Sequence, residues 1–259
     1  MKRLNFIIVA LMFLASFVYR PVLPEMLPTH WNIRGQIDSY MPKNIAIWMM
    51  PAIALLSFLG FYFLPMIDPK KEKYKLFKSE WAIIKTALIG FFAYMQFLTF
   101  YIAINPGTNM MPLMFMGLGV LFILLGNYLS KIRQNYFIGF KLPWTLASED
   151  NWNKTHRFAS WCYVIAGTVT LIEAYFIWYA PVVVFASLIL ASILPVIYSF
   201  LLFKKMEDKM KFIYVGLLVV FLGIFMIRLL AGEDGWICDG GKWVKHGAPS
   251  APIPNRPCR

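Results

Sequence analysis

Residues 44–67 read NIAIWMMPAIALLSFLGFYFLPMI, an apolar run with no charged side chain and no helical periodicity. A helix that spans a bilayer needs about 20 mostly apolar residues, so this run is long enough to cross a membrane. Comparable runs occupy residues 81–104 and 158–179. The sequence therefore predicts an all-α membrane protein whose chain crosses the bilayer several times.

The composition of the whole chain favours the same class. Of the 259 residues, 59% are hydrophobic and 15% are charged. Soluble domains carry about 45–50% apolar and about 25% charged residues. We therefore expect a polytopic helix bundle in a plasma membrane, with the lipid bilayer as its first partner.

We expect about seven spans. Their bounds follow the apolar runs: residues 4–19, 44–67, 81–104, 110–129, 158–179, 181–203 and 212–231. The first run follows Lys2 and Arg3, as in a signal peptide, but no small-x-small cleavage site comes after it. The segment that begins Arg20-Pro21 is typical of a helix exit, so we interpret the first run as a retained helix.

The orientation follows from the basic residues of the short loops, which are more frequent on the cytoplasmic side. With alternate crossing, one side receives Lys2, Arg3, Lys70, Lys71, Lys73, Lys75, Lys78, Lys131, Arg133, Lys141, Lys154, Arg157, Lys204, Lys205, Lys209 and Lys211. The other side receives only Arg20, Arg34 and Lys43 before the tail. We therefore expect the N-terminus in the cytoplasm and the C-terminus outside. The net charge of +12 is then a topology signal and an attraction to anionic lipid; direct binding of nucleic acid is disfavoured, because no basic soluble domain carries it.

Three polar regions divide the chain. We expect an N-terminal two-span unit in residues 1–67 with an exported motif at 23–43, a five-span bundle in 68–231 with a cytoplasmic motif at 126–157, and an exported tail at 232–259. Prolines and a glycine in the exported motif argue against a continuous helix there. Four prolines in the tail predict an extended strap. Residues 68–73, DPKKEK, have the composition of an ordinary charged connector.

The cytoplasmic motif is the most distinctive stretch. Gly139 and Pro143 predict an irregular segment over residues 135–146. Ser148 is then a candidate N-cap, with Glu149 and Asp150 in the first turn of a helix that continues into the fifth span.

On that helix one face collects several motif side chains. Trp152, Thr155, His156 and Ala159 recur at i, i+3, i+4 and i+7. A belt of interfacial Trp residues at a helix start would explain part of this pattern. A functional site is favoured, because the irregular segment just before it is equally specific.

These residues resemble a known family. Asn135, Gly139, the block Pro143-Trp144-Thr145-Leu146, Trp152 and Thr155-His156-Arg157 resemble the motif of the SdpI family of bacterial membrane immunity proteins. Lys141 stands where many relatives have Arg, which keeps the charge and loses the bidentate geometry. The exported region, with Leu23-Pro24, Pro28-Thr29-His30-Trp31-Asn32, Gly35 and Asp38, is similar to the small domain of unknown function that often precedes this motif.

The resemblance implies immunity to a secreted peptide toxin that attacks the membrane, and recruitment of a soluble cytoplasmic repressor. It also implies which residues bind. They are Asn135, Gly139, Lys141, Pro143, Trp144, Thr145, Leu146, Trp152, Thr155, His156 and Arg157, with Pro28, Thr29, His30, Asn32, Gly35 and Asp38 on the exported side. The tail lies outside the family pattern.

Cysteines and intramembrane charges give two further expectations. Cys162 lies within a span, whereas Cys238 and Cys258 bracket the exported tail, where an oxidising compartment permits a disulfide. Glu173 lies inside the fifth span and needs a partner there. Arg228, at similar depth in the last span, is the natural candidate for a structural ion pair; a proton or solute pathway is the alternative.

The sequence contains no P-loop, nucleophile elbow or Cys-x-x-Cys motif, so we expect no enzymatic activity and no cofactor. Two other functions stay open. A small-solute or peptide transporter would need inverted repeats or interrupted helices. A metal-dependent membrane hydrolase would need His30, Glu25 and Asp38 as a ligand or acid–base set, although a zinc site takes three or four ligands.

Overall fold

The computed structural model describes residues 2–32, 35–176, 180–204, 218–223, 235–246, 253 and 258. The chain divides into two compact units, Met1–Lys205 and Met206–Arg259. Each unit is described by itself.

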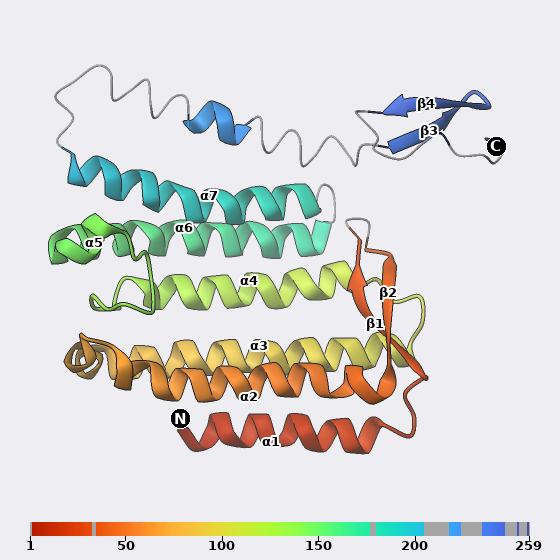
Figure 1. Cartoon of the computed structure of the whole chain (residues 1–259), viewed down its shortest axis with the longest axis horizontal. Coiled ribbons are helices and arrows are strands. Elements are labelled where there is room, and N and C mark those ends of the chain that lie inside the picture. Colours follow the sequence, from red (N-terminus) through yellow and green to blue (C-terminus); the bar gives the residue numbers. More distant parts are fainter. Residues whose placement is uncertain are drawn as a thin grey trace. The chain divides into compact units, whose positions relative to one another are not determined.

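Long helices make up the first unit (Figure 1). They are α1 (Lys2–Tyr19), α2 (Lys43–Ile67), α3 (Lys78–Ile104), α4 (Met110–Leu129), α6 (Glu149–Phe176) and α7 (Ala180–Phe203). Within the described residues, five helices are long and apolar enough to cross a membrane, and α1 is a shorter apolar helix. The predicted polytopic bundle is therefore confirmed. The seventh predicted span lies mostly outside the described residues, and residues 218–223 within it are helical.

Short elements connect the helices at the two ends of this bundle (Figure 1). The 3₁₀ helix η1 (Lys71–Phe77) and the short helix α5 (Pro143–Ala147) lie at the end where the chain begins, which we name the motif end. The strands β1 (Met26–Trp31) and β2 (Ile37–Pro42) lie at the other, which we name the hairpin end. The basic loops predict that the motif end is cytoplasmic.

β1 and β2 form an antiparallel pair, which the all-α prediction did not include. Met26 faces Pro42 and Trp31 faces Ile37, with irregular register around His30. The prolines that exclude a helix are compatible with this pair, because proline is tolerated on edge strands and both strands of a two-stranded sheet are edge strands. Leu27 on β1 is fully buried against Ala46, Ile47 and Phe100, so the hairpin packs onto the ends of α2 and α3.

Helices α4 and α6 approach closely through small residues. A Cβ on Gly119 would lie 2.8 Å from the carbonyl oxygen of Gly167, and a Cβ on Gly126 would lie 2.8 Å from the backbone nitrogen of Val164. The hydroxyl of Ser160 also donates to the carbonyl oxygen of Gly126. Small residues let helix backbones approach in a membrane, where no hydrophobic driving force brings helices together.

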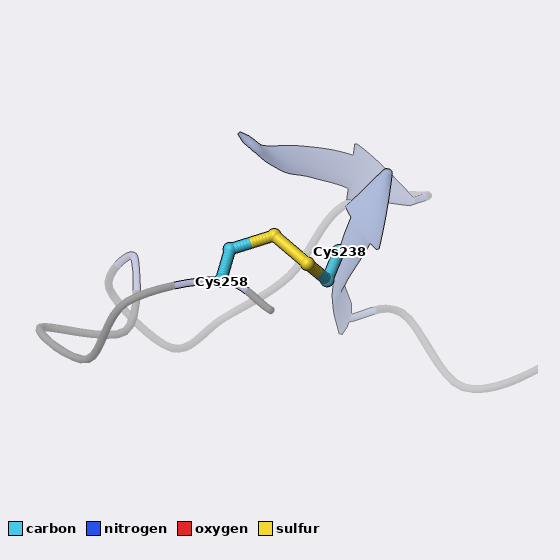
Figure 2. The surroundings of a disulfide bond; sticks show 2 residues. All are labelled: Cys238 and Cys258. Carbon is cyan, nitrogen blue, oxygen red and sulfur yellow. A yellow bond between two sulfur atoms is a disulfide. The ribbon is translucent and has the colours of Figure 1, made fainter. Parts of the chain in front are cut away.

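The second unit contains the hairpin of β3 (Gly235–Asp239) and β4 (Lys242–His246). Gly240 and Gly241 turn the chain with φ of 55° and 79°, the left-handed conformations that a two-residue hairpin loop requires. The structure joins Cys238 and Cys258 in a disulfide across 20 residues, with their Cα atoms 5.4 Å apart (Figure 2). The predicted strap is thus in part a hairpin, whose strands the proline count did not reveal.

Candidate functional site

Asn135 organises the irregular segment that follows α4. Its side chain is fully buried. Oδ1 accepts hydrogen bonds from the backbone N–H groups of Phe137 (2.9 Å) and Ile138 (2.7 Å), and Nδ2 donates to the carbonyl oxygens of Arg133 (2.9 Å) and Ile138 (3.2 Å). One side-chain amide therefore pairs with backbone N–H and C=O groups of a tight turn, which lack the partners that a helix or strand would give them.

Asp68 connects this turn to the segment after α2. The residue is 2% exposed, and its carboxylate accepts hydrogen bonds from the backbone N–H of Lys70 (2.7 Å) and, across the bundle, from that of Tyr136 (3.0 Å). The Tyr74 hydroxyl lies 3.0 Å from Oδ2 of Asp68 and 3.3 Å from Oδ1 of Asn135. These contacts tie the 68–77 connector to the motif.

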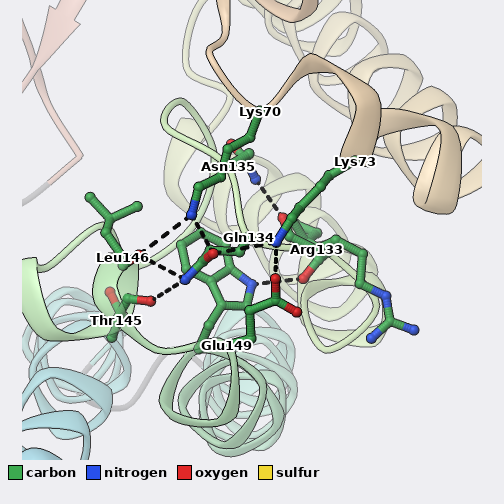
Figure 3. Close-up of polar contacts among 10 residues, drawn as sticks. Lys70, Lys73, Arg133, Gln134, Asn135, Thr145, Leu146 and Glu149 are labelled. Carbon is green, nitrogen blue, oxygen red and sulfur yellow. Dashed lines mark hydrogen bonds and ion pairs between the residues drawn. The ribbon is translucent and has the colours of Figure 1, made fainter.

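Gln134 forms the neighbouring part of this network (Figure 3). Its Nε2 donates to the carbonyl oxygens of Thr145 (2.8 Å) and Leu146 (2.9 Å), and its Oε1 accepts from Lys70. Lys73 forms an ion pair with Glu149 at the start of α6. Partial burial, and then the charge of Lys73, lower the pKa of Lys70. Three segments far apart in sequence therefore meet at one polar cluster.

His156 anchors the segment from the helix side. Its ring is fully buried. Nδ1 lies 2.8 Å from the carbonyl oxygen of Trp152, and Nε2 lies 3.0 Å from the backbone nitrogen of Phe140. Because the carbonyl can only accept and the N–H can only donate, Nδ1 carries the proton, Nε2 accepts, and the ring is neutral.

Gly139 has the conformation and the space that this contact demands. Its φ is +100°, a region that L side chains rarely adopt. A Cβ there would also overlap Nε2 of His156. Both reasons require glycine at this position.

The predicted face of α6 is buried at every position. Trp152, Thr155, His156 and Ala159 are each 0% exposed. The Trp152 indole stacks on the His156 ring with centroids 4.0 Å apart and donates to the carbonyl oxygen of Ile132 at 2.9 Å. These side chains therefore point into the protein and not toward a soluble partner.

The start of α6 is capped as predicted. The hydroxyl of Ser148 accepts from the backbone N–H of Asn151 at 3.2 Å, and Glu149 and Asp150 occupy the first turn. The Asn151 side chain donates to the carbonyl oxygen of Ser199 on α7 at 3.0 Å, and Thr155 donates to Asn151 at 3.0 Å.

The Pro143-Trp144-Thr145-Leu146 block forms most of α5, where an irregular segment was predicted. Pro143 is its first helical residue, a position that suits proline. The buried Thr145 hydroxyl accepts from the backbone N–H of Leu142 at 2.9 Å and lies 2.6 Å from the carbonyl oxygen of Phe140. The Trp144 indole donates to the Ser199 hydroxyl at 2.9 Å, which attaches α5 to α7.

Three predicted binding residues of the cytoplasmic motif, Lys141, Pro143 and Arg157, are exposed, and two of them are basic. Lys141 donates to the carbonyl oxygen of Phe137 at 3.0 Å, and Arg157 projects from α6 beside the buried His156. Within the predicted cytoplasmic motif, Lys141 and Arg157 are therefore the charged side chains that a soluble partner can reach.

The exported motif residues all lie in or next to the β1–β2 hairpin. His30 Nδ1 and Asp38 Oδ1 are 2.6 Å apart, and both side chains are exposed. The Asn32 side chain accepts from the backbone N–H of Gln36 at 3.0 Å. Gly35 has φ of +75°, and a Cβ on it would lie 2.7 Å from Sδ of Met111, so the hairpin loop rests on the start of α4. Pro28 is buried and Thr29 is half-buried.

Two further expectations concern a metal or acid–base set around His30 and an ion pair of Glu173 with Arg228. Glu25 pairs with Lys43 at 2.9 Å instead of joining His30, and the described residues contain no group of three or more His, Cys, Asp or Glu side chains that could hold a metal ion. Glu173 is 9% exposed. Its expected partner Arg228 lies outside the described residues.

Sequence reasoning missed Asp68, Tyr74 and Gln134. The connector was interpreted as an ordinary charged loop, yet the structure buries its first residue at the centre of the network. One signal was present, because an Asp-Pro pair directly after an apolar run marks a turn in which the carboxylate accepts backbone hydrogen bonds. Nothing local identifies Gln134, whose partners are 11 and 12 residues away.

The helices and this network define a class: the chain is a multi-pass bacterial membrane protein. Residues 131–199 match the SdpI/YfhL protein family, and residues 7–55 match a domain of unknown function, DUF1648. The chain is 28% identical to immunity protein SdpI of Bacillus subtilis (strain 168) over 207 residues, which cover 80% of this chain and 97% of that protein. The predicted resemblance is confirmed. No solved structure matches the chain.

Proposed function

We propose that this protein protects a bacterial cell from a secreted peptide that attacks the membrane, and that it does so without enzymatic activity. The observation that carries the proposal is the similarity to immunity protein SdpI over nearly the whole of that protein. The matched family region, residues 131–199, contains the motif side chains of the network, from Asn135 to His156, and its contacts with Asp68 and Tyr74 lie outside that region.

The network supports a mechanical role for the motif. Gly139, Thr145, Trp152 and His156 use their conformations and polar atoms to hold residues 131–148 against α6. These contacts give the motif end one defined shape. In this proposal, that shape keeps the helices packed against one another when the toxin enters the membrane.

We further propose that the exposed basic residues around the network bind an acidic surface of a cytoplasmic repressor. Arg133, Lys141 and Arg157 are exposed there. Their positive charges attract a negatively charged surface over about 8–10 Å. The buried motif residues would set the position of these charges and would not touch the partner.

Deletion and complementation test the protective function. The probe is the secreted peptide fraction of the bacterial strain that carries this chain. We expect a mutant that lacks the chain to lose membrane potential when it is exposed to this fraction, and expression of the chain from a plasmid to restore the potential. Equal potentials in mutant, complemented and parent cells would refute the proposal.

A further inference from the structure

A groove runs between α1 and α3 in the half of the bundle nearer the hairpin end. It has a volume of about 340 Å³ and is lined mainly by apolar and aromatic side chains, among them Leu11, Ala15, Ala93 and Phe97. Tyr19, Tyr101 and Asn105 stand at its hairpin end, and Gln96 lies within it. With a rise of 1.5 Å per residue, the lining from Ile8 to Tyr19 extends about 16 Å, which is about half of a hydrocarbon core of about 30 Å.

The amide of Gln96 has a fixed orientation. Its Nε2 donates to the carbonyl oxygen of Met12 and to the hydroxyl of Ser16, both at 3.0 Å. Ser16 in turn donates to the carbonyl oxygen of Ile47 on α2 at 2.6 Å. Because the Met12 carbonyl can only accept, the nitrogen must face α1, and Oε1 takes the other side of the amide.

Oε1 of Gln96 has no hydrogen-bond donor among the residues that the structure describes. The side chain is 3% exposed. Oε1 is not among the fully buried unpaired atoms of the described residues, so it keeps some accessible surface, and Gln96 lines the groove. An amide carbonyl without a partner is costly there, because the surrounding lipid chains contain no donor. The oxygen is therefore an unpaired acceptor in a groove whose other polar side chains, Tyr19, Tyr101 and Asn105, lie at its hairpin end.

We propose that the groove binds an apolar peptide segment inserted into the hairpin-end half of the bilayer, and that Oε1 of Gln96 accepts a hydrogen bond from a side-chain donor on that peptide. This inference rests on the proposed function, which supplies a secreted, membrane-active peptide as the partner. Gln96 precedes Ile104 at the end of α3 by eight residues, so the donor lies about 12 Å below the hairpin end of the helix. An acyl chain would fill the apolar part of the groove but leave the oxygen unpaired.

The experiment compares two synthetic probes with the full-length protein in nanodiscs of phosphatidylethanolamine and phosphatidylglycerol. One probe is a Leu/Ala transmembrane helix with a single serine about 12 Å below its outer end, and the other has alanine there. Binding is measured by energy transfer between a labelled peptide and the labelled protein. We expect the serine peptide to bind about fivefold more tightly than the alanine peptide, the effect of one hydrogen bond.

Three variants separate the groove from general stability. Gln96→Leu should remove the preference for serine. Thr99→Val, on the same helix but outside the groove lining, should keep it. Because Gln96→Leu also frees Ser16 and Met12 and could prevent folding, Ala15→Phe is the second test: it fills the groove, retains the Gln96 hydrogen bonds and should abolish binding of both peptides.

Equal binding of the two peptides to the unmodified protein would overturn the proposal, as would unchanged binding to Ala15→Phe. Phospholipid found in the groove by native mass spectrometry, with no peptide bound, would also overturn it. A separate result distinguishes failure of this inference from failure of the proposed function. If cells with Gln96→Leu keep their membrane potential under challenge while deletion mutants lose theirs, immunity stands and the groove is not the site.

Discussion

The backbone N–H of Phe140 donates to Nε2 of His156 at 3.0 Å, across 16 residues of sequence. The same imidazole donates from Nδ1 to the carbonyl oxygen of Trp152. One neutral ring thus links an irregular segment to the first turns of α6. It explains why a histidine is useful in a place where no proton transfer or metal chemistry is expected.

Replacement of this ring should loosen the motif segment. In His156→Ala the buried N–H of Phe140 loses its acceptor, at a cost of about 1–3 kcal/mol. We expect trypsin to cut after the exposed Lys141 about tenfold faster, because cleavage follows the population of the opened segment. The substrate is membrane vesicles whose motif end is accessible, and mass spectrometry identifies the cut.

Arg157→Ala is the matched control, since Arg157 is adjacent and exposed. It should leave the rate at Lys141 unchanged. Equal rates in His156→Ala and Arg157→Ala would show that the imidazole does not hold the segment.

The Tyr74 hydroxyl should stabilise the junction between connector and motif. It contacts Asp68 and Asn135, so Tyr74→Phe should lower the free energy of unfolding by about 1 kcal/mol. Tyr136→Phe is the control, because the contact of Tyr136 with Asp68 uses its backbone nitrogen. Unfolding in mixed detergent micelles provides the comparison. A Tyr74→Phe variant as stable as Tyr136→Phe would contradict the proposed junction.

The sequence predicted the bundle well because long apolar runs have few alternatives in a membrane. The ends of α2 and α4 agree with the predicted spans to within one residue. The Ser148 cap was also predictable, because capping depends on residues within one turn. Prediction succeeded wherever the deciding interactions are local.

The site was predicted only in part, because its energetics depend on long-range contacts. Helical spacing identified Trp152 and His156 as neighbours on one face, but only the fold shows that this face is buried. Asp68 contacts a backbone group 68 residues away, which no local pattern contains. The β1–β2 hairpin was missed because proline was interpreted only as a helix breaker.

Close packing of α4 on α6 gives a further prediction. Gly119→Ala places a Cβ 2.8 Å from the Gly167 carbonyl oxygen, so the helices must separate, at a cost of about 1–3 kcal/mol. Gly90→Ala on α3 is the matched control, because a Cβ there meets nothing within 4 Å. It should be neutral or stabilise by up to about 1 kcal/mol. The midpoint of thermal unfolding should fall in Gly119→Ala and stay the same or rise in Gly90→Ala; equal midpoints in the two variants would refute the close approach.

The orientation is tested by enzyme fusions. The excess of Lys and Arg at the motif end predicts that this end is cytoplasmic. Alkaline phosphatase fused after Arg259 should be active, since it would be exported, and a fusion after Lys78 should be inactive. The reverse pattern of activities would show that the chain has the opposite orientation in the membrane.

The most direct test of the account is the survival of cells that depend on altered motif residues. Cells without the native chain express His156→Ala, Trp144→Ala or the unaltered protein, and all are challenged with the secreted peptide fraction of the parent strain. Blotting of membranes measures the abundance of each protein. The account predicts normal abundance and lost protection for both variants, because the motif end loses its defined shape while each apolar span stays long enough to insert. Full protection by both variants at normal abundance would contradict it.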